Sequence, residues 1–292
     1  MRAAIYGGPH SIELGERPDP VLASPTDAVV RVVLACVCGS DLWYYRGESP
    51  HALGPIGHEF MGVVDQVGSA VRGIGTGDLV IAPFTYSDGT CAHCRAGWTS
   101  NCIAGGAFGN NGIDGGQGEA VRVPTHRQHA RPRSRRRPFG RHPALPAHAF
   151  EQLARSFGAT DVLADRGDAA VEAVRDMTEG IGVDASLECV GTGQSMATAF
   201  AIARPGSVVG AVGAPHGVEV PIETVISRNI GLRGGVAPVR RYIPELLDDV
   251  LEGRILPGRV FDFETDLNGI AEAYAAMDER RAVKSLIRVA PA

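Results

Sequence analysis

The hydrophobic pattern of this 292-residue chain changes once, near residue 150. Before that point the apolar segments are short, rich in β-branched residues and bounded by glycine, which is typical of strands; they cover residues 27–38, 57–71 and 77–84. After it, amphipathic helical segments alternate with almost wholly apolar strand segments, with helices at 149–159, 168–180 and 194–204 and strands at 183–191 and 206–213. Such alternation indicates a parallel sheet covered on both faces. The sequence therefore predicts a β-domain followed by an α/β domain.

The charge of the chain argues against two classes of partner. The net charge is −5, and residues 125–149 alone carry seven arginines and no acidic residue, so the remainder carries −12 (−5 less 7). A body this acidic has no general attraction for nucleic acid or for an anionic membrane. The sequence also contains no apolar run of about 18 residues, and its first residues lack the apolar core of a signal peptide. We therefore expect a cytoplasmic protein with no nucleic-acid or membrane partner.

Two glycine-flanked turns of the first domain carry three candidate metal ligands. Cys38 lies in CVCGSD (36–41), and His58 and Glu59 lie in GHE (57–59). A thiolate, an imidazole and a carboxylate are the ligand types of a catalytic zinc, which takes about three protein ligands and keeps one position open. Taken singly, each residue could instead be an ordinary core cysteine or histidine. Their combination favours a catalytic zinc site.

A second candidate metal site lies in SDGTCAHCRAGWTSNC (87–102). Cys91 and Cys94 form a C-x2-C pair, and Cys102 follows after seven residues. Three thiols so closely spaced in a chain of this size indicate a metal site more than disulfides. Asp88 stands three residues before Cys91 and is the first candidate for a fourth ligand of a closed structural zinc site, with His93 as the alternative. Asp88 could equally be a simple turn residue in SDG.

These motifs resemble those of the zinc-dependent medium-chain alcohol dehydrogenases. The segment GHEFMGVVDQVGSAV matches the family signature G-H-E-x2-G-x5-G-x2-V at Gly57, His58, Glu59, Gly62, Gly68 and Val71. CGSD resembles the family's first zinc-ligand turn, and the cysteine segment resembles its structural zinc loop, with Asp88 in place of the first of four cysteines. The resemblance covers residues 1–123 and about 150–292, including ECVG (188–191) and GAVG (210–213).

The resemblance implies a GroES-like β-barrel catalytic domain joined to an incomplete Rossmann-type parallel-sheet domain. By position, the catalytic and zinc domain spans 1–124, and the chain returns to it at about 258–292. The truncated dinucleotide-binding domain spans 150–257, and 125–149 is an irregular segment rich in Arg, Pro and His. The family also implies NAD or NADP as cofactor, a small alcohol or carbonyl compound as substrate, and a homo-oligomer, either a dimer or a tetramer.

The resemblance further implies roles for single residues. Cys38 and His58 would bind the catalytic zinc, and Glu59 would join or leave the metal as ligands exchange. Ser40 would relay the departing proton, and Asp41 would orient the imidazole ligand. The zinc would lower the pKa of the alcohol, and a hydride would pass to the nicotinamide.

The family's relay histidine is missing from this chain, and its cofactor contacts are matched only at single positions. Many relatives have a histidine two residues after the Asp, where this chain has Trp43; His51 is an alternative relay residue. The matched cofactor contacts are Gly191 after ECV, Gly213 after GAV, and Lys284 near the C-terminus as a pyrophosphate contact. The alternative is that the two glycines only form strand-end turns and that Lys284 is a surface charge.

One part of the family's Rossmann domain is missing from the sequence. Between the β-domain and FGATDV (157–162) the family has a strand, a G-x-G-x-x-G loop and a helix whose N-terminus binds pyrophosphate. The chain contains no G-x-G-x-x-G, and GTGQSM (191–196) lacks the third glycine. Only 125–149 is available, which is shorter than the roughly 30 residues of a βαβ unit. The missing part would also carry another catalytic zinc ligand and the residue that selects NAD or NADP.

Three interpretations of the arginine-rich segment follow. It could be a basic arm that binds nucleic acid, a natural interdomain linker, or the product of a reading-frame slip joined to a deletion, which we favour. We therefore expect a zinc-dependent, NAD(P)-linked oxidoreductase of alcohol–aldehyde/ketone interconversion, impaired by the loss of its pyrophosphate-binding unit. The alternative is a non-catalytic zinc-binding remnant, or an interaction module, of the same family.

Overall fold

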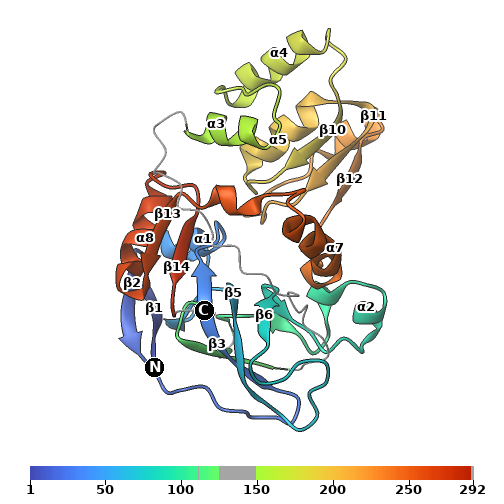
Figure 1. The fold of residues 1–292 in the computed structure, drawn as a ribbon. Coiled ribbons are helices and arrows are strands. Elements are labelled where there is room, and N and C mark those ends of the chain that lie inside the picture. Colours follow the sequence, from blue (N-terminus) through green and yellow to red (C-terminus); the bar gives the residue numbers. More distant parts are fainter. Residues whose placement is uncertain (111, 125–148, 291–292) are drawn as a thin grey trace. The chain divides into compact units, whose positions relative to one another are not determined.

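The computed structural model describes residues 1–110, 112–124 and 149–290, which fall into two compact units (Figure 1). The first unit comprises Met1–Leu153 and Pro238–Ala292, and the second comprises Ala154–Ala237. The arginine-rich segment predicted at 125–149 lies outside the described residues, except for the first residue of helix α3 (Ala149–Ser156).

The boundary at Pro238 differs from the predicted return at about 258 because helix α7 (Val239–Leu251) is grouped with the first unit. The guanidinium of Arg240, near the start of α7, donates hydrogen bonds to Ser87 Oγ (2.7 Å) and to the Ser87 carbonyl (3.1 Å). These bonds attach the helix to the segment that leads into the cysteine loop.

The main sheet of the first unit is built around β3 (Ala28–Cys36). One edge of β3 pairs antiparallel along its length with β5 (Glu59–Val67), and β6 (Leu79–Ala82) continues the sheet beyond β5. The other edge of β3 has two antiparallel partners in succession, β9 (Ala120–Val123) and β14 (Ser285–Arg288). A nine-residue strand is long enough for both. Strand β13 (Phe263–Asp266) then pairs in parallel with β14.

The remaining strands of this unit form two smaller sheets. One has the order β2 (Ser11–Glu16), β1 (Arg2–Gly8), β4 (Gly54–Pro55), and the other pairs β7 (Thr85–Tyr86) with β8 (Gly106–Ala107). A single bridge, between Ala3 and Gly118, links β1 to the segment before β9. Within the described residues no pairing closes the strands into a ring. The predicted α/β class with GroES-like and Rossmann-type parts is confirmed, and the sheets of the expected β-barrel are open rather than closed in the described residues.

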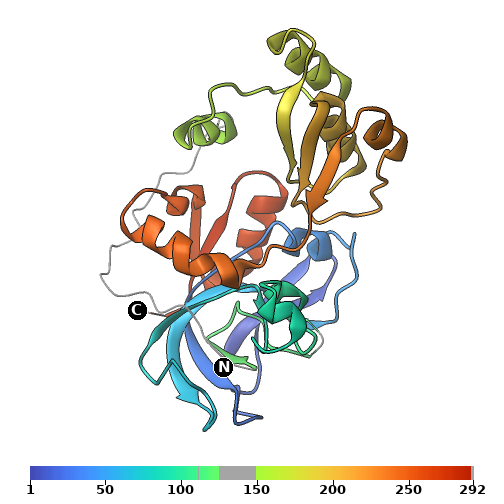
Figure 2. The same cartoon turned by 90° about the vertical axis from the view of Figure 1, so that its right-hand side faces the viewer.

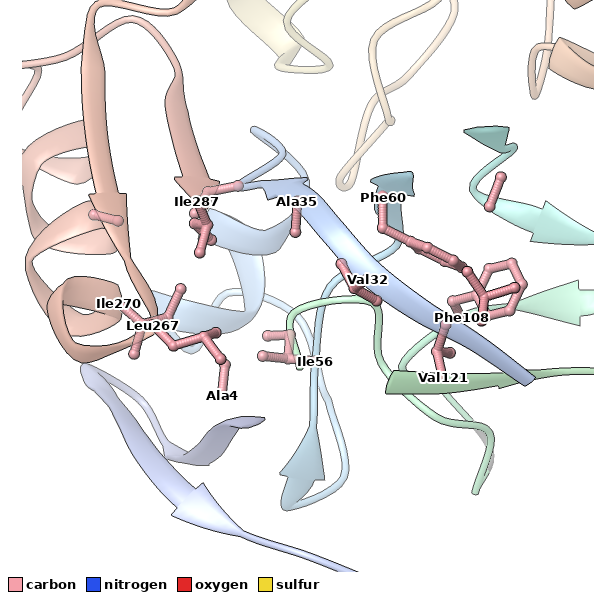
Figure 3. Close-up of a cluster of buried hydrophobic side chains, with 14 of the residues drawn as sticks. Ala4, Val32, Ala35, Ile56, Phe60, Phe108, Val121, Leu267, Ile270 and Ile287 are labelled. Atoms are coloured by element: carbon pink, nitrogen blue, oxygen red, sulfur yellow. The ribbon is translucent and has the colours of Figure 1, made fainter. Parts of the chain in front are cut away.

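Short helices complete the first unit. They are α1 (Asp41–Tyr45), α2 (Ala92–Arg95), α8 (Ile270–Asp278), and the 3₁₀ turns η1 (Thr99–Asn101), η2 (Pro257–Val260) and η3 (Leu267–Gly269). Apolar residues of α1, η3 and α8 join the β3 and β5 side chains in one core. In Figure 3, Phe60 lies against Phe108, with ring centroids 5.0 Å apart, and Leu267 and Ile270 lie near Ala4. The C-terminal segment therefore completes the core that the N-terminal strands begin.

The second unit contains a three-stranded parallel sheet with the order β10 (Val183–Glu188), β11 (Ala203–Ala211), β12 (Gly231–Gly234). Its helices are α4 (Gly167–Met177), α5 (Gly193–Ile202) and α6 (Ile222–Ser227). Helix α5 packs on β10 and β11, and α4 packs on α5; the strands lie side by side in both views (Figures 1 and 2). The predicted parallel sheet is confirmed.

The prediction that both faces of this sheet are covered is wrong. Along β10, Ser186 and Glu188 are buried, whereas Leu187, which points to the other face, is 74% exposed. Alternate residues of a strand face opposite sides of a sheet, so one side of the sheet has no covering layer at Leu187. A parallel sheet usually needs helices on both faces, and the sequence has no room for the missing βαβ unit.

None of the helices in the described part of the chain combines the length and hydropathy needed to cross a bilayer.

Glu188 organises the turn that follows β10. Its Oε1 accepts hydrogen bonds from the backbone N–H of Val190 and Gly191 and from Ser195 Oγ, each at 2.7 Å. Thr192 and Ser195 then cap the first turn of α5 reciprocally. Burial by itself raises the pKa of Glu188, but these hydrogen bonds outweigh it and lower the pKa below its ordinary value. The ionised carboxylate therefore stabilises the folded turn.

The core of the first unit can be tested with two leucines. Leu267 is 2% exposed and lies in the main cluster, whereas Leu53 is 72% exposed. We expect Leu267→Ala to lower the free energy of unfolding of this unit by about 2–5 kcal/mol, because a cavity is left behind. Leu53→Ala should change it by less than about 0.5 kcal/mol. Urea unfolding measures both, and equal effects would contradict the assigned core.

The Glu188 turn predicts a pH effect on stability. Because the folded pKa lies below the unfolded value of about 4.3, the carboxylate stabilises the second unit above that pH, and the stabilisation is lost as the pH falls through the folded value. Glu188→Gln should cost about 1–3 kcal/mol at pH 7 and flatten the fall in stability below about pH 5. The urea midpoint measured from pH 7 to pH 3 shows both effects. Glu223→Gln, at an exposed position of α6, is the control, and a slope unchanged in Glu188→Gln would refute the assignment.

Candidate metal centres and active site

Strand pairing brings the first candidate metal site together. Cys36, the last residue of β3, is in register with Glu59, the first residue of β5, and with Leu286 of β14. The Val37 N–H also donates to the Ser285 carbonyl at 3.2 Å. Because both partners run antiparallel to β3, the end of β3 lies beside the start of each. Residues far apart in the sequence therefore meet where β3 ends.

Three predicted ligands lie at this point. One ligand atom each of Cys38, His58 and Glu59 lies within 4.8 Å of the others, and all three residues are partly exposed. A thiolate, an imidazole and a carboxylate match the donor set of a zinc site with one open position. The residues present therefore fit zinc, and partial exposure leaves the group accessible to a substrate.

The imidazole of His58 is held at both nitrogens. Its Nδ1 lies 3.3 Å from Asp41 Oδ1, and its Nε2 lies 3.2 Å from Ser40 Oγ. Burial by itself lowers the pKa of His58, but the charge of Asp41 and the neighbouring Cys38 outweigh it and raise the pKa to about 9. Ser40 and Asp41 therefore each contact one nitrogen of the ring, and their roles as proton relay and orienting group stay predictions. Which ring nitrogen of His58 would bind the metal stays a prediction.

Glu59 has two further neighbours that sequence reasoning did not connect with it. Lys284 Nζ donates to Glu59 Oε2 at 2.6 Å and to the Val37 carbonyl at 3.2 Å, and Cys36 Sγ donates to the same Oε2 at 3.0 Å. Burial raises the pKa of Glu59, but the charge of Lys284 outweighs it, and the net pKa is lowered. Burial by itself lowers the pKa of Lys284, but its electrostatic interactions with Cys36 and Glu59 raise it to about 12. Glu59 is therefore held as an ionised carboxylate.

Lys284, the only lysine of the chain, was expected at the cofactor pyrophosphate. The structure places its ammonium group on Glu59, and a contact with pyrophosphate stays a prediction. The register of β14 against β3 would have indicated this position, but a pairing between residues about 250 apart cannot be read from local pattern.

The ring of His51, the alternative relay residue, packs against Tyr44, with centroids 4.5 Å apart.

The second candidate metal site is local. Asp88, Cys91, Cys94 and Cys102 each offer a ligand atom within 4.8 Å of the others, and His93 is not part of this group. Asp88 also serves as a turn residue, because its Oδ1 accepts from the N–H of Thr90 (2.7 Å) and of Cys91 (3.0 Å). The two roles weighed for Asp88 are compatible, since a carboxylate has a second oxygen.

Local electrostatics favour the charged form of Asp88 and Cys91 and disfavour that of Cys94. The N–H groups of Thr90 and Cys91 lower the pKa of Asp88 to about 2. Backbone N–H groups of Ile103 and Cys94 lower the pKa of Cys91 to about 7, whereas burial raises that of Cys94 to about 12. Three thiols and one carboxylate form the four-ligand set of a closed structural zinc site. The residues present therefore fit zinc here too.

The two predicted cofactor glycines lie in the second unit, and each has a structural reason to be glycine. Gly191 has φ +91°, and a Cβ there would lie 1.9 Å from the Ala214 carbonyl oxygen. A Cβ on Gly213 would lie 2.4 Å from Gly191 N. Close approach of these two turns requires glycine at both positions. Their role toward a dinucleotide stays a prediction.

Two known protein families match this chain, one in each half. The family described as "Alcohol dehydrogenase GroES-like domain" matches residues 24–133, and "Zinc-binding dehydrogenase" matches residues 147–252.

Individual relatives extend over most of the chain. "Zinc-type alcohol dehydrogenase B" of Aspergillus flavus is 28% identical over 353 residues, covering 99% of this chain and 81% of that protein. "Medium chain reductase/dehydrogenase ucsI" of Acremonium sp. is 32% identical over 279 residues, covering 74% of this chain and 94% of that protein. The solved structure of alcohol dehydrogenase TADH from Thermus sp. ATN1 is 28% identical, with a TM-score of 0.90, covering 99% of this chain and 100% of that one. The chain belongs to the zinc-dependent medium-chain alcohol dehydrogenases, a family of oxidoreductases.

Proposed function

We propose that this chain is a zinc-dependent, NAD- or NADP-linked oxidoreductase that interconverts a small alcohol with its aldehyde or ketone, and that it turns over slowly. One observation carries the proposal: Cys38, His58 and Glu59 converge within 4.8 Å, and the Ser40 hydroxyl lies against the imidazole. The names of the Aspergillus flavus and Thermus relatives support an alcohol as substrate. A cytoplasmic location and a dimeric or tetrameric assembly belong to the same proposal and rest on the family resemblance.

The chain's own residues would bind and orient the reacting groups. Cys38, His58 and Glu59 would hold the zinc, which when bound acts as a Lewis acid toward an alcohol or carbonyl oxygen. Ser40, 3.2 Å from His58 Nε2, is placed to accept a proton released by the substrate hydroxyl. Asp41 orients the imidazole, and Lys284 keeps Glu59 ionised. Asp88, Cys91, Cys94 and Cys102 would hold a second, structural zinc.

We expect slow turnover because part of the dinucleotide-binding domain is missing. The 353 aligned positions of the Aspergillus flavus relative exceed the 292 residues of this chain, so at least 61 positions of that relative have no counterpart here (353 less 292). After β9 ends at Val123, the next described element is α3, which begins at Ala149. Gly191 and Gly213 would then be the cofactor contacts that remain in the second unit. Without a glycine loop at a helix N-terminus, the pyrophosphate loses its main backbone donors.

A second candidate function is a non-catalytic zinc-binding remnant or interaction module. It is favoured by the open face of the β10–β12 sheet at Leu187, because a complete Rossmann domain would cover both faces. The two candidates differ in what they bind. The enzyme binds zinc at both groups and saturates with dinucleotide, whereas the remnant holds zinc at Asp88–Cys102 only.

The metal content separates the two candidates. We expect chelator-washed protein reconstituted with zinc to retain two ions per chain by elemental analysis. Cys38→Ser should retain one, and Cys94→Ser should retain one and unfold more readily, because a closed four-ligand site contributes to folding. One ion in the unsubstituted chain, with no change in Cys38→Ser, would favour the remnant. No transition metal at all would contradict both candidates.

Dinucleotide binding tests the impairment. Losing two hydrogen bonds from backbone N–H groups to the pyrophosphate costs about 3 kcal/mol, which weakens binding on the order of 100-fold. We therefore expect the zinc-loaded chain to bind NADH or NADPH about 100-fold more weakly than Thermus TADH under the same conditions, measured by nicotinamide fluorescence. Affinity equal to that of TADH would show that the missing unit is not needed.

A further inference from the structure

A chain of buried polar side chains leads away from the first metal site into an otherwise apolar core. Asp41, Gln117 and Tyr274 are all exposed by 1% or less. Their neighbours are the apolar side chains of the main core, including those on α8. A buried polar group without a partner costs stability, so polar side chains at such positions are normally hydrogen-bonded to one another.

Hydrogen bonds run in series from α8 to Asp41, and an ion-pair contact links Asp41 to His58. Tyr274 donates from its hydroxyl to Gln117 Oε1 at 2.8 Å. Gln117 Nε2 donates to the Cys36 carbonyl at 3.1 Å and, at the longer distance of 3.4 Å, to Asp41 Oδ2. Asp41 Oδ2 also accepts from the Cys38 N–H at 3.0 Å. The other oxygen, Oδ1, lies 3.3 Å from His58 Nδ1.

Each member has a defined role in this series. Burial raises the pKa of Tyr274 well above its ordinary value, with a smaller contribution from Asp41, so the hydroxyl stays protonated and donates. A hydroxyl that donates to Oε1 fixes which end of the Gln117 amide faces Asp41, because the amide nitrogen must then point toward the carboxylate. The carboxylate is thereby held from two sides, by an amide and by the Cys38 backbone.

The glycine before His58 makes room for Gln117. Gly57 has φ +91°, and a Cβ there would lie 2.4 Å from Gln117 Cγ and 2.5 Å from Gln117 Cδ. The backbone of Gln117 is hydrogen-bonded as well, because its carbonyl accepts from the Ala4 N–H at 2.8 Å. The G-H-E segment therefore presents a metal ligand on one side and accommodates this buried amide on the other.

We propose that Gln117 and Tyr274 are positioning residues of the first metal centre. Tyr274 orients the Gln117 amide, the amide orients Asp41, and Asp41 orients the His58 imidazole among the other ligands. Neither residue touches a ligand atom of the metal group. The inference rests on the proposed metal site at Cys38, His58 and Glu59. Groups that orient a ligating histidine typically change metal affinity 10- to 100-fold when they are removed.

Cobalt(II) substitution tests the proposal, because the visible spectrum of the ion depends on the geometry of its ligands. The variants are Tyr274→Phe, which removes only the hydroxyl, and Gln117→Leu, which removes the amide at similar volume. Tyr6→Phe is the matched control: Tyr6 is 3% exposed, and its hydroxyl donates at 3.0 Å to the Tyr44 carbonyl, near the opposite end of α1 from Asp41. Subtracting the spectrum of Cys38→Ser isolates the first site from the cysteine-loop site in each protein.

We expect Tyr274→Phe and Gln117→Leu to bind cobalt about tenfold more weakly at the first site and to shift its visible bands. The cysteine-loop site in the same molecules should be unchanged, which separates this effect from general destabilisation. Tyr6→Phe should leave both sites as they were. If Gln117→Leu does not fold, Tyr274→Phe alone decides.

Two results would overturn the proposal in different ways. First-site affinity and spectrum unchanged in both variants would refute the role of Gln117 and Tyr274 while leaving the metal site intact. No cobalt at the first site of the unsubstituted chain, seen as a zero difference from Cys38→Ser, would refute the proposed metal site and this inference with it.

Discussion

The antiparallel pairing of β3 with β5 on one edge and with β14 on the other is the constraint on which the first unit depends. It aligns Cys36 with Glu59 and brings Ser285 beside Val37, so three segments separated by up to about 250 residues meet at one place. The ladder hydrogen bonds and the apolar side chains of β3 stabilise this arrangement over its whole length. The polar groups at its end are therefore held by a structure that does not depend on them. Ligands can be preorganised there without each of them contributing to folding.

The two candidate metal sites reach the same kind of geometry by different routes. In the cysteine loop, three ligands fall within twelve residues, and backbone N–H groups of the loop itself prepare Asp88 and Cys91. At the end of β3 the ligands come from separate strands, and their support comes from further away, through Asp41 to Gln117 and Tyr274. A local site requires only that the loop closes. A non-local site requires the whole sheet and the C-terminal helix.

The second unit shows what remains of a parallel sheet when part of its layer structure is missing. Glu188 and the close glycine turns at 191 and 213 still form a well-bonded end of the sheet, which is where α/β sheets bind ligands. A parallel sheet also needs a covering layer on both faces, and this requirement is not met at Leu187. The chain therefore combines a first unit with a candidate zinc site and a second unit whose sheet is incomplete.

The sequence by itself determined the element types and indicated the candidate ligands of both sites, because hydrophobic period and ligand spacing are local properties of the chain. The family followed from the resemblance of its motifs. It also revealed the missing glycine loop, since a motif can be searched for directly. Only the tertiary structure decided that the sheets are open, that Lys284 pairs with Glu59, and that Gln117 and Tyr274 lie in line with Asp41. Each of these depends on strand register or on contacts between residues 76 to 225 positions apart, which no local pattern encodes. The sequence suggested a cofactor contact for Lys284 because it could not show the neighbours of this residue, which are set by the pairing of β14 with β3.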